Sequence, residues 1–446
     1  MKIILPSFAA VLMLVVAGCF EQTSTVQDVP VASPTIAAAA PSSTPSPIPT
    51  PTPTPTPPQL AYVNETGEVW LSEATGGRKS LLIRSEDCPA AHTLIWSPMG
   101  DRLACLGRPS GRPLVNNWNM LADLTVGSIA GSLVTRAESI AGFAWSPTGA
   151  HFAYNTAPKV AGQRDQARPS DLGGTHYIAR SNGTVIKEIP GTAARSGLPP
   201  DFEAGNFAWS PDGRRLALVL ASGRTALYDL TTGNLLLLPP DIDRVLAWVL
   251  GGRSLLVATE HNPDCYVVCF QAQLLDLADG GMVRVPILDN GRTFWPAPDG
   301  AMAVTYTRAE EGAAFPIVVA LLDFTTLSLT SIPGSSIGYP SEYIPQEHLA
   351  FEPDGTGFAW ADVAWTHALF RANPDGSGLT RLSALLPFRI AFSPDVREFA
   401  YGTTGRVGEP RFLHTANLDG SGDVRVGVAS AYAWRPLPRR TDLNGR

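Results

Sequence analysis

The sequence predicts an all-β protein, and within that class a β-propeller of eight four-stranded blades, with seven blades as the alternative. Three observations lead to this prediction. A short motif, an aromatic residue followed by Ser-Pro-Asp-Gly or a variant of it, recurs along most of the chain. The copies stand about 40 to 65 residues apart, a spacing typical of propeller blades and repeat arrays. Each copy leads into a run of alternating side chains that indicates a β-strand.

The clearest copy covers residues 207–219, with the sequence FAWSPDGRRLALV. Trp209 ends one predicted strand, and its large ring suits the wedge between two blades. Residues 210–213 predict a turn, because proline fixes a negative φ, Asp bonds its own backbone and Gly accepts a positive φ. The strand that follows is apolar on both faces, as expected where a strand lies between two neighbouring sheets.

The other copies keep the aromatic residue but vary the turn. The aromatic positions are, in chain order, Trp96, Trp145, Trp209, Trp248, Trp295, Phe351, Phe392 and Trp434. Trp248 and Trp434 lack the Asp-Gly pair, which is why seven blades remains the alternative. Residues 60–82 predict later strands of a blade without an inner strand, which we expect residues 432–436 to supply. This pairing of the two chain ends closes the ring and hides both sheet edges.

The repeats resemble the WD-like Pro-Asp repeats of TolB-type β-propellers. The residues that carry the resemblance are Trp145-Ser-Pro, Trp209-Ser-Pro-Asp-Gly, Phe351-Glu-Pro-Asp-Gly and Phe392-Ser-Pro-Asp. It covers residues 60–436. The α/β domain that precedes the propeller in TolB proteins is not readable in this sequence. The resemblance therefore implies the fold but not the cellular role of TolB.

The first residues predict export and a lipid anchor. Residues 1–18 resemble a signal peptide, with Lys2 ahead of an apolar run that is too short to span a bilayer. Val-Ala-Gly-Cys at residues 16–19 resembles the lipobox of bacterial lipoproteins, which implies acylation of Cys19, with palmitate or a similar chain, and cleavage before it. An ordinary cleaved signal is the alternative. We expect an exported, extracytoplasmic lipoprotein that is attached to the cell membrane.

The remaining chain divides into three predicted parts. Residues 19–58 begin with the lipidated Cys and form a disordered linker rich in Pro and Thr, which at about 3.1 Å per residue reaches up to roughly 100 Å. Residues 59–437 form the propeller, and residues 438–446 form a disordered tail. The net charge of −7, with no basic stripe, argues against nucleic acid as a partner. We expect a monomer that carries no cofactor.

The predicted connections differ between the two faces of the propeller. The turns between first and second strands and between third and fourth strands are short. The other connections are long, at residues 157–174, 191–205, 260–269 and 334–348. Insertions in repeat proteins gather on one face, which is often the binding face. The candidate binding residues on it are Arg164, Asp165, Arg168, Asp171, His176, Phe202, His261, Asp264, Tyr339 and Tyr343.

Four cysteines besides Cys19 predict disulfides in an exported protein. Cys265 and Cys269 share one loop. Cys88 precedes the first strand of a predicted hairpin and Cys105 lies on its second strand, so the two can meet. A metal site is disfavoured because no His-Cys cluster of ligand spacing accompanies them, and free buried thiols are the remaining alternative.

No motif assigns catalysis. Residues 334–338 match G-x-S-x-G around Ser336, but no helical pattern follows as a nucleophile elbow requires. Residues 417–423 alternate oxygen-bearing side chains, which a hairpin turn explains better than a calcium loop. We therefore expect a module that binds a protein, peptide or glycan at the cell envelope. The alternatives are a propeller hydrolase or lyase with its site at the channel mouth, and a structural spacer.

Overall fold

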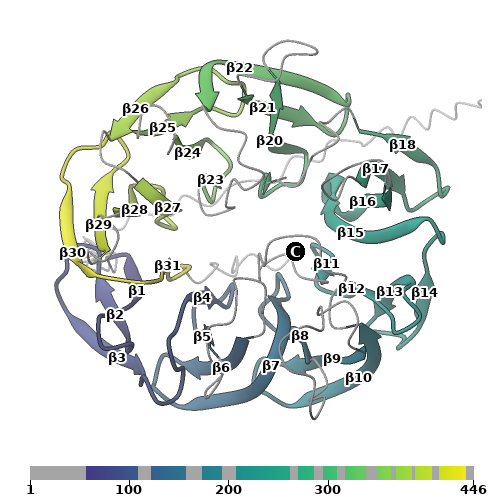
Figure 1. Ribbon diagram of the computed structural model, residues 1–446, viewed down its shortest axis with the longest axis horizontal. Coiled ribbons are helices and arrows are strands. Elements are labelled where there is room, and N and C mark those ends of the chain that lie inside the picture. Colours follow the sequence, from purple (N-terminus) through teal and green to yellow (C-terminus); the bar gives the residue numbers. More distant parts are fainter. Residues whose placement is uncertain are drawn as a thin grey trace, which may run out of the picture. The chain divides into compact units, whose positions relative to one another are not determined.

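The protein consists of antiparallel β-sheets that stand around a common centre (Figure 1). The computed structural model describes residues 57–108, 122–156, 173–192, 207–261, 270–285, 295–308, 317–337, 349–362, 368–383, 387–403 and 411–437. These residues belong to one folding unit, Thr56–Arg446. Within them the secondary structure is nearly all strand, and the helix η2 (Leu250–Gly252) is a single 3₁₀ turn. The all-β class predicted from the sequence is confirmed.

The two ends of the described chain meet in one four-stranded sheet. From the centre outward, its strands are β31 (Tyr432–Trp434), β1 (Gln59–Val63), β2 (Val69–Glu73) and β3 (Lys79–Ile83). Leu60 pairs with Trp434, and Tyr62 pairs with Tyr432. The inner strand of this sheet thus comes from the far end of the chain, at the residues that the sequence indicated.

The next sheet has seven strands, where the sequence predicted two separate blades. It consists of β4 (Thr93–Trp96), β5 (Arg102–Gly107), β6 (Ala122–Ser128), β7 (Leu133–Trp145), β8 (His151–Thr156), β9 (Gly173–Arg180) and β10 (Val185–Thr192). The 13-residue strand β7 pairs with β6 through its first part and with β8 through its second. Ser139, with φ of 55°, and a register shift after Ile140 bend the strand between these two parts.

Five further sheets have four strands each, in sequence order from the centre outward. Two of them comprise β11 (Ala208–Trp209), β12 (Arg215–Val219), β13 (Thr225–Asp229) and β14 (Leu235–Leu237), then β15 (Ile242–Val249), β16 (Ser254–His261), β17 (Phe270–Asp276) and β18 (Met282–Arg284). The third comprises β19 (Trp295–Pro296), β20 (Met302–Arg308), β21 (Ile317–Asp323) and β22 (Ser328–Ile337). The last two comprise β23 (Leu349–Phe351), β24 (Phe358–Asp362), β25 (Ala368–Ala372) and β26 (Thr380–Ser383), then β27 (Pro387–Phe392), β28 (Glu398–Thr403), β29 (Phe412–Asn417) and β30 (Val424–Val428).

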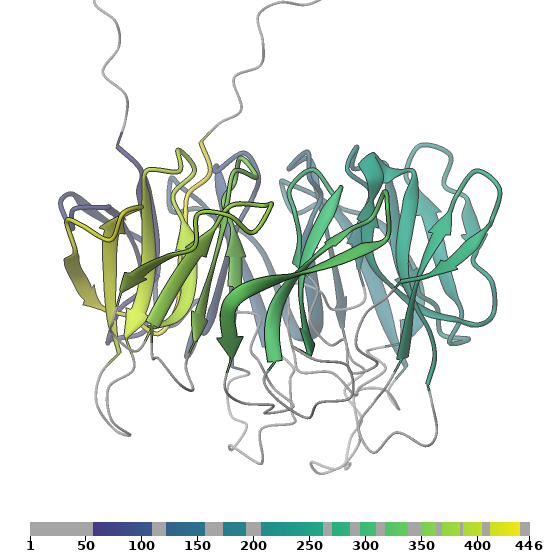
Figure 2. The same cartoon turned by 90° about the horizontal axis from the view of Figure 1, so that it is seen from above.

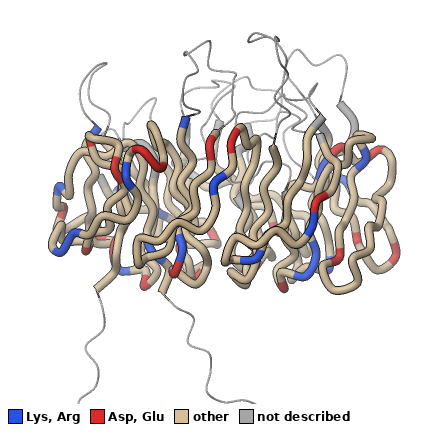
Figure 3. The backbone as a smooth tube through the Cα atoms, turned by 90° about the horizontal axis from the view of Figure 1, so that it is seen from below, with Lys and Arg blue, Asp and Glu red and all other residues tan. Residues whose placement is uncertain are grey.

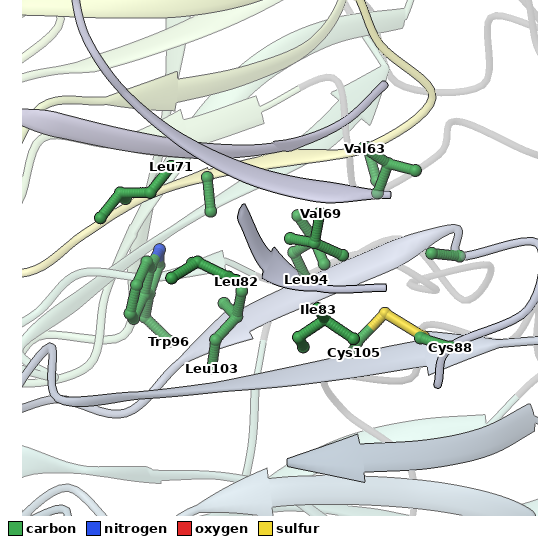
Figure 4. Packing of buried hydrophobic residues seen from close by; sticks show 13 residues of the cluster. Val63, Val69, Leu71, Leu82, Ile83, Cys88, Leu94, Trp96, Leu103 and Cys105 are labelled. Atoms are coloured by element: carbon green, nitrogen blue, oxygen red, sulfur yellow. A yellow bond between two sulfur atoms is a disulfide. The ribbon is translucent and has the colours of Figure 1, made fainter. Parts of the chain in front are cut away.

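The hydrophobic core lies between neighbouring sheets. One cluster joins Ile178 of β9 to Trp209 and Leu216 of the next sheet. Another joins Leu71 and Val69 of the first sheet to Leu103 and Trp96 of the second (Figure 4). The second strand of a sheet is therefore buried on both faces; in β12 every residue after Arg215 is buried. This is the pattern that the apolar run after the turn predicted.

Indole hydrogen bonds join the inner strands of neighbouring sheets. In each bond, the Nε1–H of a tryptophan donates to a backbone carbonyl of the preceding inner strand. The accepting residue is the one immediately before the aromatic residue of that strand. The bonds run from Trp96 to Ala433 (3.1 Å), Trp145 to Ile95 (3.2 Å), Trp209 to Ala144 (3.2 Å), Trp248 to Ala208 (2.8 Å) and Trp434 to Ala391 (2.9 Å). The accepting residue is mostly Ala, because the indole of the next sheet packs against it.

The turn after the aromatic residue is held by its serine. Ser210 Oγ accepts a hydrogen bond from the backbone N–H of Arg215 at 2.8 Å and lies 2.5 Å from Asp212 Oδ1, to which it donates.

In the sheet of β23–β26 a glutamate replaces this serine. Glu352 is fully buried and binds Arg371 through two contacts, Oε1 to Nε at 2.5 Å and Oε2 to Nη2 at 3.0 Å. Such a bidentate pair offsets the cost of burying the carboxylate.

Candidate functional site

The sheets have two unlike edges (Figure 2). The short-turn edge carries the turns between first and second strands, such as residues 97–101 and 210–214, and those between third and fourth strands, such as residues 74–78. The long-loop edge is where second strands lead to third strands and where one sheet leads to the next. The strand ends at residues 156 and 173, and those at residues 337 and 349, lie at this edge. The strand order thus gathers the long connections at one edge, as the sequence predicted.

A shallow cavity of about 260 Å³ opens at the long-loop edge, where the two ends of the described chain come together. It lies between the β1–β2 turn, the segment after Cys88 and the residues on either side of the β29–β30 hairpin. Its lining is Val63, Asn64, Glu65, Gly67, Ala90, Ala91, Arg411, Val428, Ala429 and Ser430. Glu65 and Arg411 give the lining one carboxylate and one guanidinium, and the rest is small or apolar.

Local hydrogen bonds fix the wall of this cavity. Asn64 Oδ1 accepts from the backbone N–H groups of Thr66 at 3.0 Å and Glu68 at 2.9 Å, which shapes the β1–β2 turn. Ser430 Oγ donates to the carbonyl of Ala91 at 3.2 Å across the meeting point of the chain ends. Ala90 has φ of 45°, a left-handed conformation that is costly for a residue with a Cβ. The wall is preorganised and locally strained.

The disulfide that the sequence predicted between Cys88 and Cys105 is present (Figure 4), and it anchors one side of the cavity. Both sulfur-bearing residues are buried in the cluster between the first and second sheets. The bridge ties the segment that leads to Ala90 and Ala91 to strand β5. The other two cysteines, Cys265 and Cys269, lie outside the described residues, so their pairing stays a prediction.

His176 is buried, whereas the sequence placed it among binding residues beside a long loop. Its Nε2 lies 2.6 Å from the carbonyl oxygen of Val219, and its ring meets Phe207 edge-on. Gly191 makes room for the imidazole, since a Cβ there would overlap the ring. Burial lowers the pKa of His176, and this outweighs the hydrogen bond with Val219, which raises it. The side chain thus bridges two sheets and is not part of an exposed binding surface.

The other candidates from the sequence lie beyond what the structure describes. These are Cys19, Arg164, Asp165, Arg168, Asp171, Phe202, Asp264, Tyr339 and Tyr343. His261 is the last residue of β16, and only its backbone is described. The cavity residues Glu65 and Arg411 were not predicted, because they lie in short connections that carry no motif.

The catalytic and metal motifs gain no support. Ser336 lies within β22 and pairs with Val318 of β21, whereas a nucleophile elbow places its serine on a turn between strand and helix.

Among the described residues no three His, Cys, Asp or Glu side chains gather as a metal site would need. The described part of the chain also has no helix that is long and apolar enough to cross a membrane. Basic and acidic residues are interspersed along the described backbone (Figure 3).

Comparison with known proteins finds similar solved structures but no family. No protein-family model and no curated protein matches the sequence. The chain is similar to a crystal structure of a eukaryotic initiation factor, with a TM-score of 0.54 and 12% identity over 86% of this chain and 100% of that one. The β-propeller domain of the trilobed protease from Pyrococcus furiosus gives 0.47 and 12%, over 76% and 98%. TolB from Acinetobacter baumannii gives 0.35 and 16%, over 85% and 82%.

Identities this low show a shared fold alone. The described residues define a β-propeller, because their sheets stand around a common centre with an edge strand of each sheet innermost. A shared fold does not determine function, which depends on the residues at the edges of the sheets and in the cavity.

Proposed function

We propose that the protein is a lipid-anchored, extracytoplasmic β-propeller that binds a protein, peptide or glycan at the cell envelope through its long-loop edge. The observation that carries this proposal is the preorganised cavity at that edge, with Glu65 and Arg411 in its lining. Opposite charges beside small apolar residues suit a ligand that presents both polar groups and carbon surface. The long connections on the same edge extend the area available to a large partner.

The scaffold in this proposal is a closed ring of eight blades. The seven-stranded sheet counts as two blades, because β7 serves as the fourth strand of one and the first strand of the next. The pairing of β1 with β31 supplies the closure. A closed ring removes the exposed sheet edges on which other chains assemble. It leaves the turns and loops of the two edges as the surfaces for recognition.

The chain ends support the choice of edge. The backbone N–H of Arg435 donates to the carbonyl of Gln59 at 2.8 Å, and its Nε donates to the carbonyl of Gly100 at 2.7 Å. Gly100 belongs to a short turn, so both ends of the described chain emerge at the short-turn edge. The long-loop edge therefore carries neither end of the described chain.

The test is capture of partners from envelope extract on vesicles that carry the full chain. We expect Glu65→Arg and Arg411→Glu to abolish the specific capture. Arg78→Glu is the matched control, because Arg78 is an exposed turn charge in the same sheet at the opposite edge. Equal capture by the wild type and all three variants contradicts binding at the long-loop edge.

A second arm of this experiment tests the anchor by itself. The wild-type chain is expected to partition into the detergent phase of Triton X-114, and Cys19→Ala into the aqueous phase. A wild-type chain recovered in the aqueous phase rules out lipid anchoring and leaves the result on the binding edge intact.

A further inference from the structure

The turn between β1 and β2 carries a network of side-chain hydrogen bonds beside the cavity. Its centre is the Glu68 carboxylate, whose Oε2 accepts a bond from the indole Nε1–H of Trp70 at 3.1 Å. The same oxygen accepts from Thr66 Oγ1 at 3.1 Å and from Asn64 Nδ2 at 3.3 Å. The bond from Trp70, and after it the bond from Thr66, lower the pKa of Glu68, so the group is charged at neutral pH. Asn64 lines the cavity, so this carboxylate lies one hydrogen bond away from the lining.

The indole of Trp70 extends the cavity wall toward the last sheet. The ring is partly exposed, and it packs against the apolar cluster between the first sheet and the sheet of β27–β30, which lie side by side in Figure 1. Ala429 belongs to this cluster and also lines the cavity. Trp70, Glu68 and the cavity lining therefore adjoin one another, and we call them together the seam surface.

The backbone along the seam surface is engaged in bonds within the fold. The N–H of Val63 donates to the carbonyl of Ala431 at 2.9 Å, and its carbonyl accepts from the N–H of Ser430 at 3.2 Å. In the turn, the N–H of Asn64 donates to the carbonyl of Glu68 at 2.9 Å. At these positions a ligand meets side chains, and not the open backbone edge with which an extended peptide pairs.

The side chains of the seam surface suit a ligand rich in hydroxyl groups. Glu65 and Glu68 provide carboxylate oxygens, which accept hydrogen bonds, and the guanidinium of Arg411 donates them. A hydroxyl group both donates and accepts, so neighbouring hydroxyls of a sugar ring can use both kinds of partner. The C–H groups on the face of such a ring can pack on an aromatic side chain, which Trp70 provides.

We propose that the seam surface binds a glycan, with a sugar ring packed on Trp70 and its hydroxyls bonded to the charged side chains beside it. This inference rests on the proposed function and deepens it, because it names the class of ligand that the long-loop edge takes. A peptide held by a large apolar side chain fits less well. The cavity is shallow, with a volume of about 260 Å³, and its described apolar lining consists of valine and alanine.

The test distinguishes a glycan from a protein by the chemistry of the bound material. Beads that carry the full chain are mixed with envelope extract, and bound sugar and bound protein are both measured. One portion of the extract is first digested with proteinase K, which is then inactivated. Another portion is first oxidised with periodate, which cleaves the carbon–carbon bond between vicinal hydroxyls. We expect the capture of sugar to survive digestion and to be lost after oxidation.

Three variants locate the binding. Trp70→Leu removes the aromatic face and is expected to weaken the binding of the captured sugar by about tenfold. Trp70→Phe keeps an aromatic face and should retain most of the binding. The matched control is Tyr177→Leu, since Tyr177 is a partly exposed aromatic residue that stacks on Tyr154 in another sheet.

The outcomes separate this inference from the proposed function. Capture of sugar that proteinase K abolishes or that periodate leaves unchanged overturns the glycan proposal, as does equal binding by Trp70→Leu and the wild type. Capture of protein alone also overturns it but leaves the proposed function intact. No capture from untreated extract contradicts both.

Discussion

A single imidazole, that of His176, links three separate parts of the molecule. It belongs to β9 and fits beside β10 because Gly191 has no side chain there. Its Nε2 lies within hydrogen-bond distance of the carbonyl of Val219 on the next sheet. Its Nδ1 is buried and has no hydrogen-bond partner in the described structure. An imidazole in this position is tolerated in its neutral form, because burial disfavours the charged form.

Stability is therefore expected to fall as the pH drops below about 6.5, the ordinary pKa of His176. The unfolded chain takes up a proton there that the folded chain does not, so the unfolded state gains on acidification and the contribution is full only above that pKa. Urea unfolding between pH 5.5 and 7.5 measures the slope. His176→Asn should reduce the dependence of unfolding free energy on pH. Phe207→Leu is the control, because it weakens the packing against the imidazole but keeps the titrating group, so the slope should persist. Identical slopes in all three proteins would contradict this account.

At the scale of elements, an inner strand contacts the sheets on both sides of it. Its aromatic residue packs against the preceding sheet, and the small residue before it receives the indole of the next sheet. In β11 these are Trp209 and Ala208. The arrangement recurs at the five inner strands whose tryptophan donates across, so these sheets are positioned by their neighbours as well as by their own hydrogen bonds.

Trp209→Phe is expected to keep the aromatic packing and to lose the bond to the carbonyl of Ala144. The loss should lower the free energy of unfolding by about 1 kcal/mol, the typical net worth of one hydrogen bond. Trp70→Phe is the control, since that indole donates to Glu68 within its own sheet at a half-exposed site. Urea denaturation of both variants gives the comparison. A loss no larger at position 209 than at position 70 would count against the inter-sheet role.

The repeated aromatic-turn motif was sufficient to predict the inner strands and the sharing of one sheet by the segments near Leu60 and Trp434, which the structure shows. Two further features of the structure have local signals in the sequence. The residue before the aromatic is almost always Ala, and residues 133–141 contain neither Gly nor Pro, which is consistent with an unbroken β7. Both could be read from neighbouring positions in the sequence.

The candidate site was harder to predict, because it depends on distant contacts. Ser430 and Ala91, which hydrogen-bond beside the cavity, are 339 residues apart in the chain. Glu65 and Arg411 line one cavity only because β31 pairs with β1. The burial of His176 likewise depends on Val219 of another sheet. Periodicity describes which face of a strand is apolar, but not which remote segment covers it.

At the scale of the whole molecule, the last described strand determines whether the first sheet is complete. Tyr432 and Trp434 are buried against β1 and the sheet of β27–β30, in a cluster with Leu60 and Leu413. Without them, β1 has an exposed edge and the indole of Trp96 loses its acceptor, the carbonyl of Ala433.

A chain that ends at Ser430 is therefore expected to lose about 5 kcal/mol or more, since truncating one large buried aromatic side chain costs about 3–5 kcal/mol. The control is a chain that ends at Leu437, which retains β31. Thermal unfolding followed by circular dichroism compares the two. Equal midpoints would show that the paired ends do not stabilise the fold.

Strand β7 has a consequence for how the molecule moves. Elsewhere a separate segment leads from one sheet to the next, as residues 238–241 do between β14 and β15. Along β7 there is no joint, because the ladder of backbone hydrogen bonds continues from β4 to β10. These seven strands belong to one sheet that bends at Ser139, so we expect a displacement of β4 to reach β10 more directly than it would across a connecting segment.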